Sequence, residues 1–155
     1  MAVGSSGQAR VTRAFTDAGI LAEQLYWAVS TPEAANLPFN IVNGDVFRWT
    51  WLWARIADYF DLPVAPHPGH PLPLVEQMRD AGPIWEGLVA RHGLAQWEVG
   101  KLASWWHTDA DLGRTMECFT DMTNSRIRGF TAYRNTPQSF FDVFDRLRAE
   151  RIIPS

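Results

Sequence analysis

The sequence has one cysteine, one lysine and no long apolar run, and each scarcity excludes something. A single cysteine, Cys118, cannot form an intramolecular disulfide, and its isolation favours a reducing, cytoplasmic setting. No run of about eighteen apolar residues occurs, so we expect no membrane-spanning helix. A net charge of −3 and a pI near 5.7 argue against a nucleic-acid partner, which favours clustered basic surface. Met1 to Arg10 lacks the basic and apolar regions of a signal peptide.

Aromatic residues are abundant instead. The 155 residues include eight tryptophans and nine phenylalanines, in a chain whose length is that of one domain. This composition indicates either an unusually aromatic core or a pocket that grips a flat apolar ligand, with the core favoured.

The most informative segment runs from residue 38 to residue 53. Residues 39–42 favour a short buried strand, because they are bulky and mostly apolar. Asn43 and Gly44 form a turn pair, since both residues tolerate positive φ. We expect Asp45 to cap a helix over about 46–59. A strand, a turn and a capped helix in so few residues are typical of an α/β enzyme.

The spacing of apolar residues predicts several helices. A helix capped at Thr16-Asp17 is expected to have Leu21, Leu25 and Ala28 on one face. The helix from 46 is expected to be buried on two sides, with a stripe of Trp49, Leu52, Trp53, Ile56 and Phe60 and a second flank of Phe47 and Trp51. We expect an extended loop over 62–73, which holds five prolines. Further helices are predicted near 74–78, from about Pro83 to Gly93, over about 97–107 with Val99, Leu102, Ala103 and Trp106 on one face, and as one turn from Thr123 to Gly129.

The last helix has the clearest signals. Thr136 is the expected cap and Pro137 the first helical residue. Basic residues near its end, Arg146, Arg148 and Arg151, alternate with acidic ones and indicate a solvated, charge-paired face. Short strands are also expected over 116–120 and 130–133, so the predicted fold class is α+β, mostly helical with a few short strands.

Four of these segments together resemble one family. Residues 39–49 (FNIVNGDVFRW), 105–109 (WWHTD), 123–130 (TNSRIRGF) and 151–154 (RIIP) look like the C-terminal lobe of the short-chain dehydrogenase/reductases related to progesterone 5β-reductase and iridoid synthase. The first block is highly specific, whereas the others are weak singly but occur in the right order. The resemblance implies a substrate-binding lobe over 12–155, after a ragged N-terminal end at 1–11; the full-length family is α/β.

The resemblance implies an enone or enal reductase that uses NADPH, with a tyrosine hydroxyl that stabilises the enolate. Such an enzyme needs a glycine-rich turn for the dinucleotide phosphates and a tyrosine–lysine pair. This sequence departs from that pattern. The glycines of Gly4 to Gly7 lack the G-x-G-x-x-G spacing, and no tyrosine lies within thirty residues of the single lysine, Lys101. We therefore expect no cofactor-binding or catalytic residue in this chain alone.

Trp106 and His107 are the candidate substrate-binding residues. The resemblance places them on an aromatic wall of the enone pocket, where Trp106 would pack on the substrate and His107 could hydrogen-bond a carbonyl. The alternative is structural, because Trp106 also fits the core face of its own predicted helix. Trp105, off that face, is assigned to the core or to a lobe interface.

The remaining candidates favour structural roles. His67 and His70 lie three residues apart in a proline loop, without the further ligands that a zinc site needs, so no metal site is predicted. Cys118 is interpreted as a buried, inert thiol. Asp109 and Asp111 point apart on a helix, which favours solvation at a helix end over an acid–base pair.

Three functional hypotheses follow. The chain is the substrate-binding portion of an NADPH-dependent reductase, as a fragment, a truncated gene product or the partner of a separate Rossmann-domain chain. Alternatively, it is a stand-alone, non-catalytic binding module for apolar small molecules. The third hypothesis is a remnant without activity, whose exposed apolar faces would favour self-association.

Overall fold

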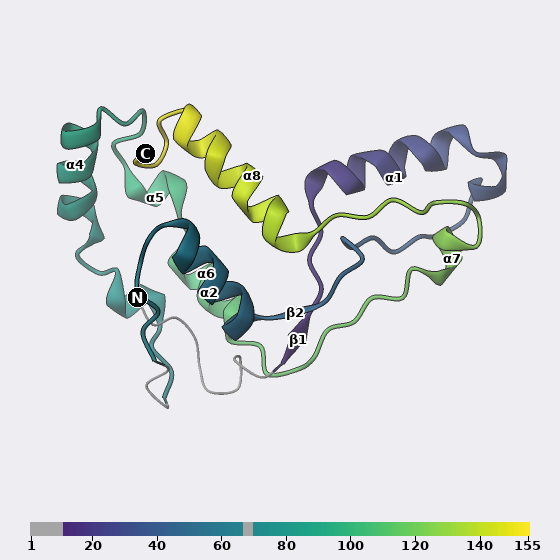
Figure 1. Ribbon diagram of the computed structural model, residues 1–155, viewed down its shortest axis with the longest axis horizontal. Helices are drawn as coiled ribbons and strands as arrows, with labels where there is room; N and C mark the ends of the chain where they lie inside the picture. Colours follow the sequence, from purple (N-terminus) through teal and green to yellow (C-terminus); the bar gives the residue numbers. More distant parts are fainter. Residues whose placement is uncertain (1–10, 67–69) are drawn as a thin grey trace.

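The computed structural model describes residues 11–66 and 70–155. The fold is mostly helical with two short strands, as the sequence predicts (Figure 1). The ragged end expected over 1–11 lies, except for its last residue, outside the described residues. The elements are β1 (Thr12–Arg13), α1 (Ala18–Ser30), the 3-10 helix η1 (Pro32–Ala34), β2 (Phe47–Arg48), α2 (Trp49–Tyr59), α3 (Leu74–Gln77), α4 (Ala81–His92), α5 (Val99–Leu102), α6 (Trp105–Leu112), α7 (Thr123–Arg126) and α8 (Thr136–Ala149).

The strand predicted over 38–42 does not form. The chain is extended there, but side chains take the place of a neighbouring strand: the buried amide of Gln24 donates to the carbonyl of Asn40 (2.9 Å), and the amide of Asn124 donates to that of Pro38 (2.9 Å). Side-chain donors can satisfy backbone carbonyls as a ladder does. The strands predicted over 116–120 and 130–133 are likewise wrong, since neither segment is in a strand.

Among the described residues, the strand pairing is confined to β1 and β2. They run antiparallel, with Thr12 opposite Arg48 and Arg13 opposite Phe47. Arg13 is buried, and its guanidinium donates to the carbonyls of Arg114 and Met116. The pair therefore ties the start of the lobe to the segment that follows α6.

Asp45 caps a different helix from the expected one. Its carboxylate accepts hydrogen bonds from the backbone N–H (2.8 Å) and the hydroxyl (2.6 Å) of Thr136, at the start of α8. The cap of α8 is itself one residue earlier than predicted: the side chain of Asn135 accepts from the N–H of Gln138 (3.1 Å). Asp45 is sequence-distant from α8, so only the folded chain brings the two together.

Asn43 is the centre of this polar network. It is fully buried, and its side chain accepts from the N–H of Asp17 (2.7 Å) and donates to the hydroxyl of Thr136 (3.0 Å). Gly44, next to it, has φ of 103°, which confirms the predicted turn and favours glycine. The turn thus joins the N-terminal ends of α1 and α8. Asp17 also accepts from the N–H of Gly19 (2.6 Å), which confirms it as the cap of α1.

The core consists of two clusters. The first lies between α1, the extended segment before β2 and the segment around α7, and contains Ile20, Val42, Met122 and Phe130. The second lies between α2 and α8, which run side by side (Figure 1), and contains Phe47, Leu52 and Ile56, with Phe140 and Phe144 against them. This confirms the stripe predicted for α2. Of the predicted second flank, Phe47 is buried but lies in β2, before the helix, and Trp51 is exposed.

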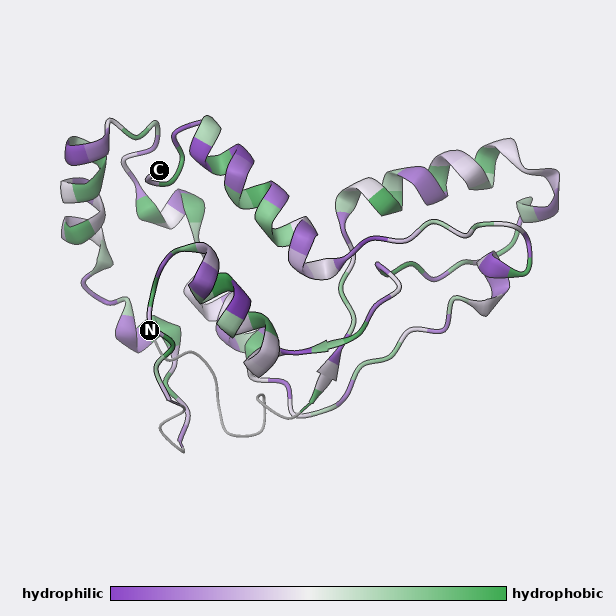
Figure 2. Ribbon diagram, viewed as in Figure 1, coloured by the Kyte–Doolittle hydropathy of each residue, from purple (hydrophilic) through white to green (hydrophobic). Residues whose placement is uncertain are grey.

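The apolar face predicted for α1 is not the face that the core covers. Ile20 and Gln24 face the core, whereas Leu21 and Leu25 are exposed together with Tyr26 (75%) and Val29 (85%). Apolar positions recur along this helix (Figure 2). The helix has apolar residues on more than one face, so its pattern alone could not decide which face the rest of the chain covers.

The helix predicted over 97–107 is two helices. Ala103 and Ser104 have extended backbone between α5 and α6, which breaks the expected face. The other predictions hold: α4 ends at Gly93 with φ of 62°, the turn of α7 closes at Gly129 with φ of 95°, and the described part of 62–73 is irregular.

Candidate functional site

Trp106 and His107 lie on the outer surface of α6. The Trp106 side chain is 69% exposed, so the interpretation of this residue as core is wrong. The break before α6 divides the predicted face between two helices, and Leu102 on α5 is exposed as well. The two rings are neighbours, with centroids 5.5 Å apart and planes 34° apart. Trp105 is partly buried, consistent with the structural role assigned to it.

Asp109, on α6, holds α3 in place. Both carboxylate oxygens of Asp109 accept backbone N–H bonds, one from Leu74 (2.7 Å) and one from Val75 (3.0 Å). The prediction that Asp109 is a solvated helix-end residue is therefore wrong, because its carboxylate caps α3. Asp111 does lie at the surface, where it pairs with Arg114 at 2.7 Å. The carboxylate of Asp109 thus fixes the helix that presents Trp106 and His107.

The cysteine and histidine predictions have different outcomes. Cys118 is exposed and not buried as predicted, because the segment around it stays at the surface instead of entering a sheet. His67 lies outside the described residues, and His70 is exposed. Within the described ranges, no cluster of three or more His, Cys, Asp or Glu side chains could hold a metal ion. None of the helices in that part of the chain is long and apolar enough to cross a bilayer.

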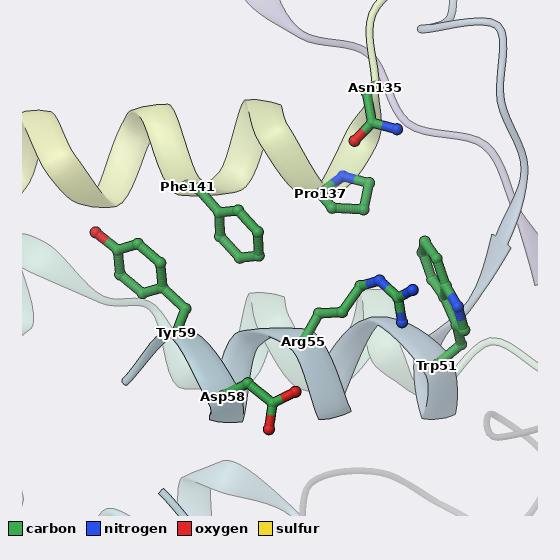
Figure 3. A pocket seen from close by; sticks show the side chains of 7 residues that line it. All are labelled: Trp51, Arg55, Asp58, Tyr59, Asn135, Pro137 and Phe141. Carbon is green, nitrogen blue, oxygen red and sulfur yellow. The ribbon is translucent and has the colours of Figure 1, made fainter. Parts of the chain in front are cut away.

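A second candidate site is a groove between α2 and α8 (Figure 3). Its volume is about 520 Å³, within the usual range for small-molecule sites. Its walls come from two helices that the second core cluster holds together. The residues that line this α2–α8 groove are Trp51, Arg55, Asp58, Tyr59, Asn135, Pro137 and Phe141.

Two arginines stack on aromatic rings in and beside the groove. The guanidinium carbon of Arg55 lies 3.8 Å from the centroid of Trp51, and that of Arg148 lies 4.6 Å from the centroid of Tyr59. Arg148 is partly buried, so the prediction of a solvated, charge-paired face does not hold for it. Such cation–π contacts hold a guanidinium in one position without a carboxylate partner.

Tyr59 forms the end wall of the groove. Its ring stacks on Phe141, with centroids 5.0 Å apart and planes 7° apart, and its hydroxyl donates to a carboxylate oxygen of Asp145. That hydrogen bond, with a smaller effect of desolvation, raises the pKa of Tyr59 above its ordinary value, while the nearby Arg148 cation opposes the rise. The phenol is therefore a neutral structural donor.

Sequence reasoning missed the groove. Trp51 appeared only as part of a buried second flank, and no signal linked it to Pro137 and Phe141. Arg55, four residues after Trp51, was the available signal, because residues at this spacing share a helical face.

The lobe also presents the exposed apolar face of α1 described above. Together with the aromatic surface at Trp106, this face defines the class of protein that the structure shows: a mostly helical lobe with large exposed apolar side chains.

Comparison with known proteins identifies that class more closely. No family model matches the chain. It is 39% identical over 142 residues to an (S)-8-oxocitronellyl enol synthase of Camptotheca acuminata, and 36% identical over 141 residues to one of Nepeta cataria. It is 35% identical over 141 residues to a 3-oxo-Delta(4,5)-steroid 5-beta-reductase of Arabidopsis thaliana. In each case the match covers 90% of this chain and 36% of the relative.

The chain is therefore a homologue of these reductases over nearly all of its length, and it is similar to one portion of them, as expected for the C-terminal lobe that the sequence blocks resemble. This confirms the resemblance inferred from the four sequence blocks. The chain spans about a third of the length of these relatives.

Proposed function

We propose that this chain supplies the substrate-binding portion of an NADPH-dependent enone or enal reductase of the short-chain dehydrogenase class. The substrate is an apolar small molecule, and the reaction is reduction of its conjugated carbon–carbon double bond. The remaining part of the reductase holds the dinucleotide and the catalytic tyrosine, either in the same polypeptide or as a separate Rossmann-domain chain. A cytoplasmic location, which the single cysteine favours, belongs to the same proposal.

The observation that carries the proposal is the unequal coverage. Relatives at 35–39% identity match 90% of this chain but only 36% of their own length. These 155 residues contain no G-x-G-x-x-G turn and no tyrosine–lysine pair. The chemistry of such a reductase therefore needs residues outside the matched portion.

The exposed face of α1 supports a docked arrangement. Leu25, Tyr26 and Val29 lie on one side of the helix and are mostly exposed. Apolar side chains grouped in this way favour contact with another surface over contact with water. We propose that the remaining part of the reductase covers this face; self-association through the same face is the competing outcome.

Trp106 and His107 are proposed to form a wall of the substrate site. Their rings are exposed and adjacent, and Asp109 anchors their helix to α3. A tryptophan ring offers a large apolar face, and the neighbouring imidazole can hydrogen-bond a carbonyl. Substrate would lie between this wall and the reductase part that carries the nicotinamide.

Reconstitution tests the proposal. The chain alone should neither bind NADPH nor oxidise it in the presence of an enal. Addition of the other two thirds of the Camptotheca acuminata relative should restore NADPH oxidation that depends on the enal. Trp106→Ala should raise KM for the enal several-fold. Tight NADPH binding by the chain alone would contradict the proposal, as would a failure to reconstitute despite stable association.

Matched variants separate docking from folding. Val29→Glu should weaken association with the added reductase part, whereas Ile84→Glu, the same change at another mostly exposed apolar residue, on α4, should not. Both variants should keep the helical circular-dichroism signal of the parent. Concentration-dependent self-association of the chain that Val29→Glu abolishes, without any association with the added part, would instead favour the remnant hypothesis.

The binding-module alternative is favoured by the α2–α8 groove, because this chain forms its walls without another domain. If the module hypothesis is right, steroid-like or terpenoid ligands should quench tryptophan fluorescence at micromolar concentration in the absence of NADPH. No response across a broad panel would count against it.

A further inference from the structure

The α2–α8 groove holds a cation that the proposed reductase function does not use. Arg55 lies on the exposed side of α2, and its guanidinium stacks on Trp51 at 3.8 Å. It points along the groove toward Trp51 and away from Asp58 (Figure 3). Three ion pairs occur among the described residues, and none of them includes Arg55. Its N–H groups are therefore available to a ligand.

The second arginine near the groove is different. Arg148 also stacks on an aromatic ring, that of Tyr59, but Tyr59 donates to Asp145, so a carboxylate already lies close to this cation. Arg148 is not among the residues that line the groove. Arg55 is therefore the cation among the residues that line the groove, and Asp58 is the carboxylate among them.

The opposite wall is flat and firmly held. Pro137 and Phe141 face α2 from the first turns of α8 (Figure 3). Phe141 cannot turn freely, because its ring is stacked on Tyr59 at 5.0 Å. Asn135, at the rim, is fixed by its cap hydrogen bond to Gln138. A ring that entered the groove would therefore meet the preformed apolar wall of Pro137 and Phe141 on one side and the Arg55 guanidinium, stacked on Trp51, on the other.

We propose that the α2–α8 groove binds a planar aromatic carboxylate. The ligand's carboxylate accepts hydrogen bonds from the guanidinium of Arg55, which stays stacked on Trp51, and its ring packs against the wall of Pro137 and Phe141. A guanidinium already stacked on tryptophan presents its N–H groups in the plane that a carboxylate needs. Asp58, about one turn along α2 from Arg55, disfavours a ligand with a second negative charge.

The experiment compares 2-naphthoate with its uncharged analogue 2-naphthamide. Each is titrated into the ¹⁵N-labelled 155-residue chain, and the indole N–H signal of Trp51 is followed by NMR. Trp51→Phe identifies that signal by its disappearance. We expect 2-naphthoate to bind with a dissociation constant of about 1 mM or lower, as ligand-efficiency bounds allow for its size. 2-Naphthamide should bind about tenfold more weakly, because it lacks the charge.

Variants assign the effect to the groove. Arg55→Gln should weaken 2-naphthoate binding about tenfold and abolish the preference over 2-naphthamide. Arg55→Lys should keep a smaller preference, and Arg91→Gln, an exposed arginine on α4, should change nothing. Equal affinity for the two compounds would overturn the proposal, as would no binding at all, or a preference that survives Arg55→Gln. These results are independent of NADPH, so failure here leaves the reductase proposal standing.

Discussion

Replacement of Asn43 by alanine tests the polar network that joins the two halves of the lobe, the half that contains α1 and the half that contains α8. The side chain is fully buried and makes two hydrogen bonds, one from the N–H of Asp17 (2.7 Å) and one to the hydroxyl of Thr136 (3.0 Å). Its backbone makes two more, with Phe15 (2.7 Å) and Arg134 (2.9 Å), and alanine keeps both. The substitution therefore isolates the side-chain contribution.

The expected loss of stability comes from two sources. Two lost hydrogen bonds contribute about 1 kcal/mol each to the free energy of unfolding. The N–H of Asp17 is then left without its partner next to a small cavity, which adds roughly 1 kcal/mol or more. We expect a total of about 3 kcal/mol, equivalent to a fall in Tm of roughly 6–12 °C for a domain of this size.

The assay is urea denaturation followed by far-ultraviolet circular dichroism, with Asn40→Ala as the matched control. Asn40 lies in the same extended segment, but it is exposed and its side-chain amide makes one hydrogen bond, to the carbonyl of Asp121 (3.0 Å). This control should lose less than about 1 kcal/mol. If Asn43→Ala cost no more than Asn40→Ala, the network would not hold the halves together and the reasoning would be refuted.

Two further predictions concern the backbone and a titrating group. Gly44→Ala should destabilise the chain by about 1–3 kcal/mol, because the φ of Gly44 is 103° and a Cβ there would lie 3.0 Å from the guanidinium of Arg126. Gly87 lies inside α4 with open space around it, so Gly87→Ala should stabilise the chain by about 0.5–1 kcal/mol in the same denaturation assay. The pKa of Tyr59 is raised by its hydrogen bond to Asp145, so the pair adds stability below the ordinary tyrosine pKa and loses it as the pH rises through the raised value. Ultraviolet titration of the phenols should show this high pKa, and Asp145→Asn should lower it; an unchanged titration curve would contradict the assignment.

Local signals in the sequence were sufficient for most helices and turns. Asp17, Gly93 and Gly129 mark helix or turn ends that the structure confirms, because caps and positive-φ glycines act over a few residues. The stripe of α2 was also correct, since Leu52 and Ile56 follow the helical period. These features depend on residues within a few positions along the chain, and the sequence gives those residues directly.

Predictions that needed distant partners were less successful. Asp45 lies just before α2 in the chain, yet it binds Thr136, ninety-one residues away. The segment 39–42 has strand-forming residues, yet side chains such as that of Gln24 occupy its carbonyls. Cys118 was expected in a strand and is exposed at the surface. Each of these outcomes depends on which helix or segment packs against the residue, and the type of the residue does not determine its packing partner.

The candidate sites divide in the same way. The family resemblance rests on residues 39–49 and three shorter blocks, and comparison with the reductases confirms it. Trp106 and His107 were selected from the sequence, and the structure adds that the Trp106 ring is exposed and not core. The α2–α8 groove came from the structure alone.

The sequence by itself therefore determined the resemblance to these reductases, the mostly helical character and the lack of a dinucleotide motif within these residues. These properties are carried by short motifs and by periodicity. Only the tertiary structure decided which face of α1 stays uncovered, which helix Asp45 caps, and that Arg55, Trp51 and Phe141 share a groove. The physical reason is that burial and contact depend on how helices far apart in the chain pack against one another. The spacing of apolar residues along a helix looks the same in the sequence whether or not another element covers that face.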